Sequence, residues 1–172
     1  MPDLYLPEQQ IQSRIREIAH QISQDYKELT AVIVLKGAMF FASDLLRHID
    51  VPVRMDTLYL GSYGKNGITP GSIRLNNDIT IDIADQDVLI IEDIVDTGRT
   101  MHFILDLFRL RKARSIKICS LLSKPSKTEI PVTIDYLGFE IPDQFVVGYG
   151  FDYKENYRTL KDICILRPEE IK

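Results

Sequence analysis

The chain has 172 residues, of which 45% are hydrophobic and 27% charged, with a formal net charge of −4. This acidic balance argues against broad binding to nucleic acid or to an anionic membrane, and no apolar run approaches the ~20 residues of a membrane helix. We therefore predict a single domain over residues 1–172, in a cytoplasmic protein with no nucleic-acid or membrane partner. The start Met1-Pro2-Asp3 lacks the basic region of a signal peptide, and the isolated Cys119 and Cys164 fit a reducing compartment.

The first part of the chain alternates helix and strand patterns. In chain order they predict a helix over 7–26, a strand over 31–35, a helix over 38–49, a strand over 51–60, and a returning strand over 73–75 and 79–83. Lys36 and Gly37 follow the strand 31–35, at the sheet edge where ligands collect in open parallel sheets. Taken alone, Lys36 is more typical of an ordinary surface lysine at a strand end.

Residues 61–71 have the composition of a loop. They contain four glycines and Pro70, together with Ser62 and Tyr63, and Lys65 is their only charged residue. Such a segment predicts a mobile loop over about 61–72 rather than a folded element. The plainer interpretation is a flexible hairpin connection.

The segment 88–100 carries the strongest signal in the chain. Residues 88–91 are apolar and mostly β-branched, which predicts a strand buried on both faces, and the acids Glu92 and Asp93 follow where it ends. The next part is small, hydrogen-bonding or cationic: Asp96, Thr97, Gly98, Arg99 and Thr100. Apolar residues then recur at helical spacing from Met101 to Phe108.

This strand–turn–helix junction predicts a site for a phosphorylated ligand. A helix start attracts phosphate through its unpaired N–H groups and its partial positive charge. Gly98 permits close backbone approach, and the acids at 92 and 93 suit sugar hydroxyls or a hard cation bridging to the ligand. The alternative is an ordinary turn in which Asp96 or Thr97 only caps the helix.

The last third of the chain adds further strands. Residues 115–122 predict a buried strand that ends near Lys124, and residues 134–139 and 145–149 predict two more. By composition alone, Phe145 and Tyr149 are core residues.

Taken together, these motifs resemble the type I phosphoribosyltransferases, whose signature is apolar residues, two acids and then D-T-G-x-T. The order of the remaining motifs is similar to the bacterial hypoxanthine-guanine branch: Leu35-Lys36-Gly37, Gly61-Ser62-Tyr63-Gly64, Lys124-Pro125, Gly138 to Pro142, Phe145 to Gly150, Asp152-Tyr153 and Arg158. The resemblance covers nearly the whole chain. Many members carry Asp at the position of Ser123 and two basic residues at Lys127-Thr128, so this chain departs from the pattern there.

The resemblance implies a fold and a reaction. The fold is α/β, with a mostly parallel central sheet flanked by helices, a flexible active-site loop containing Ser62 and Tyr63, and a small hood to which 124–172 contributes. The reaction joins hypoxanthine or guanine to 5-phosphoribosyl-1-pyrophosphate (PRPP), with Mg2+ as cofactor. A homodimer or homotetramer is expected, and the loop at Leu35-Lys36 often has a non-proline cis peptide in the family.

The resemblance also implies a role for each site residue. Asp96 transfers the proton at the purine N7. The 5′-phosphate is bound by Asp96, Thr97, Gly98, Arg99 and Thr100, whereas the PRPP ribose and the metal are bound by Glu92 and Asp93, and Asp152 also binds the metal. Pyrophosphate is bound by Lys36, Gly37 and Arg158, and the purine by Lys124, Phe145 and Val146. Two rivals remain. One is a non-catalytic nucleotide sensor that binds nucleic acid, and the other is an enzyme of the same fold that uses xanthine, adenine or uracil.

Overall fold

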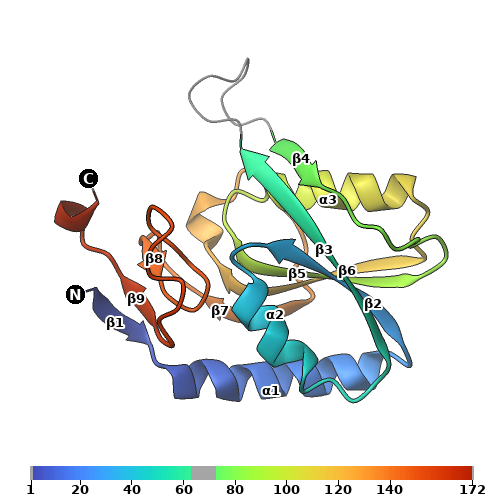
Figure 1. Ribbon diagram of the computed structural model, residues 1–172, viewed down its shortest axis with the longest axis horizontal. Coiled ribbons are helices and arrows are strands. Elements are labelled where there is room, and N and C mark those ends of the chain that lie inside the picture. Colours follow the sequence, from blue (N-terminus) through green and yellow to red (C-terminus); the bar gives the residue numbers. More distant parts are fainter. Residues whose placement is uncertain (1, 63–72, 172) are drawn as a thin grey trace.

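The computed structural model describes residues 2–62 and 73–171, and its centre is a six-stranded sheet (Figure 1). The strand order is β4-β3-β2-β5-β6-β7. The bounds are β2 Leu29–Leu35, β3 Val53–Ser62, β4 Ile73–Asn77, β5 Asp87–Val95, β6 Ser115–Ser123 and β7 Tyr136–Glu140. Only β4 runs antiparallel to its neighbour, so the predicted mostly parallel α/β sheet is confirmed.

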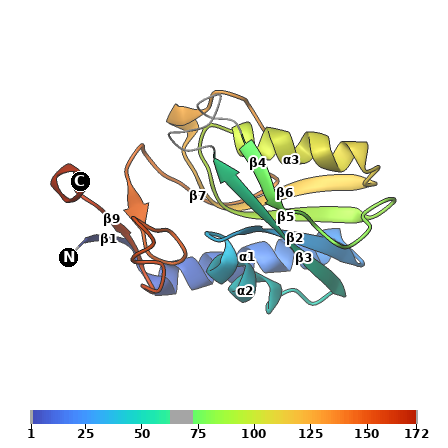
Figure 2. The same cartoon turned by 45° about the horizontal axis from the view of Figure 1, so that its top comes forward.

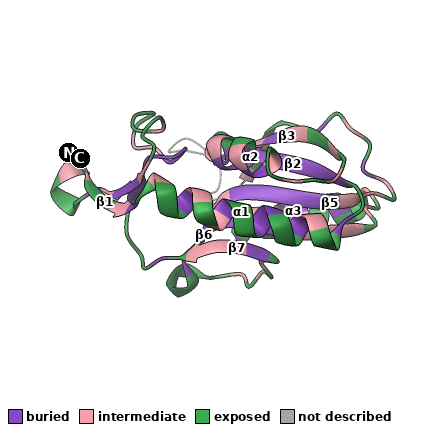
Figure 3. Ribbon diagram, turned by 90° about the horizontal axis from the view of Figure 1, so that it is seen from below, coloured by how far each residue is buried: buried purple, intermediate pink, exposed green. Residues whose placement is uncertain are grey.

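Helices cover both faces of this sheet, as Figure 2 shows. α1 (Glu8–Asp25) and α2 (Met39–Leu46) pack on one face, and α3 (Arg99–Leu110) packs on the other. β2 and β5 lie in the middle and contribute alternate side chains to the two cores, because successive side chains of a strand point to opposite faces. The buried stripe of α1 consists of Ile11, Ile15, Ile18, Ala19 and Ile22 (Figure 3).

A second, smaller sheet joins the two ends of the chain. β1 (Asp3–Leu6) pairs with β9 (Ile163–Ile165), which pairs with β8 (Val146–Val147), all antiparallel. The Arg167 guanidinium also pairs with Asp3, with 2.7 Å between Nε and Oδ2. β1 and β9 were not predicted, because each is short and the two pair with each other across more than 150 residues of the chain. The 3-10 helices η1 (Pro125–Lys127) and η2 (Pro168–Glu170) complete the elements. No helix in the described ranges is long and apolar enough to cross a membrane.

The prediction of a strand over 79–83 is wrong. The backbone N–H groups of Thr80 and Ile81 donate to the Asp56 carboxylate, at 2.6 and 2.9 Å, instead of to a neighbouring strand. A side chain thus satisfies the donors that a sheet ladder would otherwise take. Gly61 and Ser62, predicted as the start of a loop over 61–72, instead form the end of β3. Tyr63 and the rest of that predicted loop lie outside the described residues.

Candidate active site

The turn between β5 and α3 has a geometry that requires glycine. Gly98 takes a left-handed backbone with φ 84°, and a Cβ atom there would lie 2.0 Å from the carbonyl oxygen of Ile130. No other residue fits without moving the backbone. The Thr97 carbonyl oxygen accepts hydrogen bonds from the N–H groups of Glu129 and Ile130, both at 3.0 Å. The segment after β6 therefore holds this turn in place.

The turn opens on a cavity of about 260 Å³ at the amino end of α3. Six of the predicted site residues line it: Glu92, Asp93, Asp96, Thr97, Gly98 and Thr100. The free N–H groups and the partial positive charge of a helix start suit a phosphate group here. Arg99 is not among the lining residues, because its guanidinium turns to Glu129, with 2.5 Å between Nη2 and Oε2.

Asp96 carries an unsatisfied buried acceptor. Within the described residues, its Oδ1 atom is shielded from solvent and has no hydrogen-bond partner. A buried acceptor without a partner costs about 1–3 kcal/mol, and native proteins keep few of them. A carboxylate oxygen left free in the wall of a cavity is suited to accept a proton or a hydrogen bond from a ligand.

The acids at 92 and 93 lie inside β5, which continues to Val95, rather than after the strand end as predicted. Glu92 is buried, and the N–H of Asp93 donates to its Oε1 at 3.0 Å. Burial raises the pKa of Glu92 well above its usual range, and the neighbouring Asp93 charge raises it further; burial likewise raises the pKa of Asp93. A bound cation would reverse both shifts, because it favours the charged carboxylates.

A larger cavity of about 610 Å³ shares these two acids. It brings together residues from three distant parts of the chain: Lys36 and Gly37 after β2, Glu92 and Asp93 in β5, and Asp152, Glu155 and Arg158 near the C-terminus. The Leu35-Lys36 peptide bond is cis. The three residues predicted for pyrophosphate are thus neighbours, and so are the three predicted for the metal.

Hydrogen bonds fix the C-terminal wall of this cavity. Arg158 pairs with Asp152, with 2.7 Å between Nη2 and Oδ1, and its Nη1 donates to the Gly150 carbonyl oxygen, also at 2.7 Å. Behind this wall the Tyr149 hydroxyl donates to Asp44 of α2 at 2.5 Å. The C-terminal segment is therefore tied to α2, the helix that follows Lys36 and Gly37.

The residues predicted for the purine lie in two segments: Lys124 directly follows β6, and Phe145 and Val146 lie at the start of β8. The N–H of Lys124 donates to the Val95 carbonyl oxygen at 3.0 Å, which places Lys124 beside the turn between β5 and α3. Its side chain is only 11% exposed, and its ammonium lies 3.6 Å from Asp143 Oδ1. Val146 is buried, whereas Phe145 is 41% exposed and meets the Tyr153 ring edge-on, at 5.8 Å between centroids. The core position expected for Phe145 from composition alone is wrong, and that for Tyr149 is confirmed.

A family model described as a phosphoribosyl transferase domain matches residues 3–154. The chain belongs to the phosphoribosyltransferase family. The hypoxanthine-guanine phosphoribosyltransferase of Bacillus subtilis (strain 168) is 42% identical over 165 residues, which cover 95% of this chain and 92% of that protein. The hypoxanthine phosphoribosyltransferase of Salmonella typhimurium is 41% identical, covering 92% of this chain and 91% of that protein. A hypoxanthine phosphoribosyltransferase structure from Staphylococcus aureus matches with a TM-score of 0.93 at 40% identity, covering 99% of this chain and 94% of that one.

The carboxylates of this phosphoribosyltransferase have the chemistry that a magnesium ion requires. Glu92, Asp93 and Asp152 supply hard oxygen donors around one cavity, the donors that magnesium prefers. Among the described residues, no three acidic, histidine or cysteine side chains are gathered closely enough to hold a metal alone. Magnesium is commonly bound by one or two carboxylates together with substrate phosphates and water, which is consistent with this open arrangement.

Two acids of the phosphoribosyltransferase site were missed at the sequence level. Glu155 pairs with Lys36, which is 119 residues away, and Asp143 pairs with both Lys124 and Lys127. Neither acid stands in a recognisable local motif. Only the fold brings each acid beside a lysine that was predicted to bind a ligand: Glu155 beside Lys36, and Asp143 beside Lys124.

Gly37 sets the position of Asp93 in this phosphoribosyltransferase. A Cβ atom at Gly37 would lie 1.6 Å from Asp93 Oδ2, so Gly37→Ala must displace that carboxylate. We expect Gly37→Ala to lower kcat/KM for PRPP by about tenfold with little change in melting temperature, because the clash falls on a side-chain end. Initial-rate kinetics and thermal denaturation of the same sample test this. Unchanged kinetics would show that Asp93 can move freely without cost.

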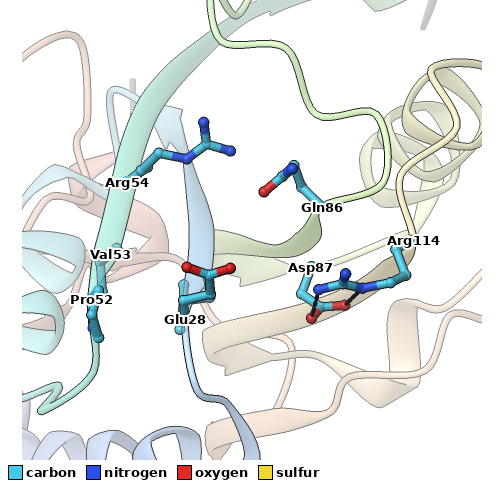
Figure 4. Close-up of a pocket in the computed structure, with 8 residues that line it drawn as sticks. Glu28, Pro52, Val53, Arg54, Gln86, Asp87 and Arg114 are labelled. Atoms are coloured by element: carbon cyan, nitrogen blue, oxygen red, sulfur yellow. Dashed lines mark hydrogen bonds and ion pairs between the residues drawn. The ribbon is translucent and has the colours of Figure 1, made fainter.

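A third hollow, shown in Figure 4, lies at the opposite end of the sheet. Its volume is about 110 Å³, and it opens at the amino ends of β2, β3 and β5. Its two arginines already have partners: Arg114 is bidentate on Asp87, and Arg54 donates to Thr30 Oγ1 at 3.2 Å. We assign it no part of the chemistry.

Proposed function

We propose that this protein is a purine-salvage enzyme, a hypoxanthine-guanine phosphoribosyltransferase. It transfers the 5-phosphoribosyl group of PRPP to N9 of hypoxanthine or guanine, and it releases pyrophosphate. The observation that carries the proposal is the cavity of about 260 Å³ between β5 and α3. It is lined by the acids Glu92 and Asp93 and by Asp96, whose Oδ1 atom has no hydrogen-bond partner among the described residues. The start of α3 suits the phosphate of a phosphorylated sugar, and the nearby acids suit its hydroxyl groups.

The proposed reaction forms the bond from C1′ to N9 and breaks the bond from C1′ to pyrophosphate. Positive charge develops on the sugar and negative charge on the leaving group, so positioning and electrostatics supply the catalysis. Thr97, Gly98 and Thr100 hold the 5′-phosphate at the start of α3. Glu92 and Asp93 hold the ribose hydroxyls close to the charge that develops on the ring.

Mg2+ is the cofactor that we propose. Glu92, Asp93 and Asp152 would hold it, in part through bridging oxygens of the substrate. When bound, it would neutralise charge on the departing pyrophosphate. The raised pKa values of the two buried acids support this assignment, because burial disfavours their charged forms and a bound cation would favour them.

The hood orients the purine, and two polar side chains, Lys124 and Asp96, bind its polar atoms. Lys124 donates to the 6-oxo oxygen, and Val146 contacts the base through its backbone. Phe145 stacks on the purine ring, for which its exposure leaves room. Asp96 takes the proton from the purine N7 as the glycosidic bond forms. Lys36, Gly37 and Arg158 bind the pyrophosphate on the other side of C1′.

The decisive experiment is an assay of the purified chain with PRPP, Mg2+ and each purine in turn. We expect nucleotide and pyrophosphate from hypoxanthine or guanine, and loss of turnover when EDTA removes the divalent ion. Turnover with adenine or uracil alone would favour the enzyme of other base specificity. No turnover with any base, together with nucleic-acid binding, would favour the sensor.

The organisation of the protein around this activity is also proposed. We propose one domain over 1–172, with residues 124–172 contributing to the purine-binding hood, in a cytoplasmic homodimer or homotetramer. Light scattering during gel filtration distinguishes the two assemblies. A monomeric mass at micromolar concentration would contradict both.

A further inference from the structure

The two cations proposed for pyrophosphate share an internal anion. Glu155 Oε2 lies 3.1 Å from the Lys36 ammonium, and Glu155 Oε1 lies 3.4 Å from Arg158 Nη2. All three residues line the 610 Å³ cavity. One carboxylate therefore bridges cations from the β2 loop and the C-terminal segment, as a phosphate oxygen would.

The backbone holds this carboxylate over the cavity. Tyr153 and Asn156 are joined by reciprocal backbone hydrogen bonds at 3.2 and 3.0 Å, which closes a tight turn. Its two central residues, Lys154 and Glu155, both have positive φ, at 51° and 62°. Such turns favour glycine and asparagine, so a glutamate here is conformationally costly and points to a role for its side chain.

A second contact fixes the turn against the cation. The N–H of Glu155 donates to Asp152 Oδ2 at 2.8 Å, and Asp152 itself pairs with Arg158. Arg158 is still not saturated, since its buried Nε has no partner within the described residues. Its side chain is 19% exposed, against 67% for Glu155, so the glutamate can swing out to solvent while the arginine stays.

We propose that Glu155 is an affinity-determining residue that competes with the pyrophosphate group for Lys36 and Arg158. The inference rests on the proposed function, because it assigns those cations to pyrophosphate. When the pyrophosphate group binds, it replaces the Glu155 carboxylate at the two cations. The carboxylate therefore lowers the affinity for PRPP and for the pyrophosphate product. The same exchange makes product release easier, because Glu155 pairs again with Lys36 and Arg158 as pyrophosphate leaves.

The test is a gain of affinity in Glu155→Gln. Each exposed ion pair contributes little, so we expect the KM for PRPP and the dissociation constant for pyrophosphate to fall about three- to tenfold. The KM for hypoxanthine should not change. Calorimetry with pyrophosphate and Mg2+ gives the dissociation constant directly, apart from turnover. Glu155→Asn, which tolerates the left-handed backbone, repeats the test should the glutamine variant fold poorly.

Glu17→Gln is the matched control. Glu17 also pairs with an arginine, Arg14, in an exposed ion pair, but on α1 and away from both cavities. The Glu17→Gln variant should bind PRPP and pyrophosphate as the wild type does. An affinity for pyrophosphate that is unchanged or weaker in both Glu155 variants would overturn the inference while wild-type turnover still supported the proposed function. A wild-type protein that neither turns over nor binds pyrophosphate would remove both.

Discussion

Replacing Asp96 with asparagine is expected to lower kcat by ~10²-fold or more while the chain stays folded. Asparagine has nearly the same shape but cannot take a proton, so the purine N7 loses its acceptor as the bond to C1′ forms. The buried Oδ1 atom has no hydrogen-bond partner among the described residues, so little packing depends on its charge. The fall should therefore appear in kcat more than in KM for PRPP.

Single-turnover rates and a melting curve of the same preparation test the prediction for Asp96. Asp85→Asn is a suitable control, because it makes the same change at an exposed position in the turn before β5, at the other end of the sheet. Asparagine also tolerates the positive φ of that residue, which is 56°. Wild-type kcat in Asp96→Asn would show that another group accepts the proton.

Much of the central sheet was predictable, because its strands are coded by local composition. The apolar runs at 31–35, 88–91 and 115–122 became β2, β5 and β6, buried on both faces. The strand predicted at 79–83 failed because a distant side chain, Asp56, took its backbone donors. No property of residues 79–83 themselves could reveal that partner. β1 and β9 escaped notice for a similar reason, since each is stabilised by pairing across nearly the whole chain.

The candidate site divides along the same line. The residues of the turn between β5 and α3 are contiguous in the sequence, so the spacing of Asp96, Gly98 and Thr100 was enough to group them. The electrostatic partners were not predictable, because Lys36 meets Glu155 only through the fold. Arg99 shows the reverse: its place in the motif suggested a phosphate contact, but a glutamate 30 residues further on holds its side chain. Sequence reasoning thus grouped the residues that line the cavities better than it predicted the ion pairs that those residues make.

Lys124→Ala is expected to weaken hypoxanthine binding far more than PRPP binding. A hydrogen bond from a charged donor contributes about 1.5–3 kcal/mol, so the KM for hypoxanthine should rise about ten- to hundredfold. The KM for PRPP should stay within about twofold, because no proposed PRPP contact involves Lys124. The same donor would disfavour adenine, whose exocyclic amine offers the mostly buried ammonium no acceptor at that position of the purine.

Lys127→Ala separates this role from a general effect of charge. Lys127 pairs with the same acid as Lys124, with 3.4 Å between Nζ and Asp143 Oδ2, but its side chain is 42% exposed. Removing it deletes one positive charge and one partner of Asp143, while the ammonium proposed for the purine remains. We expect the KM for hypoxanthine to change less than about twofold in Lys127→Ala, as for an exposed ion pair. Equal losses in the two variants, or equal effects of Lys124→Ala on both substrates, would mean that Lys124 supports the hood rather than reading the 6-oxo group.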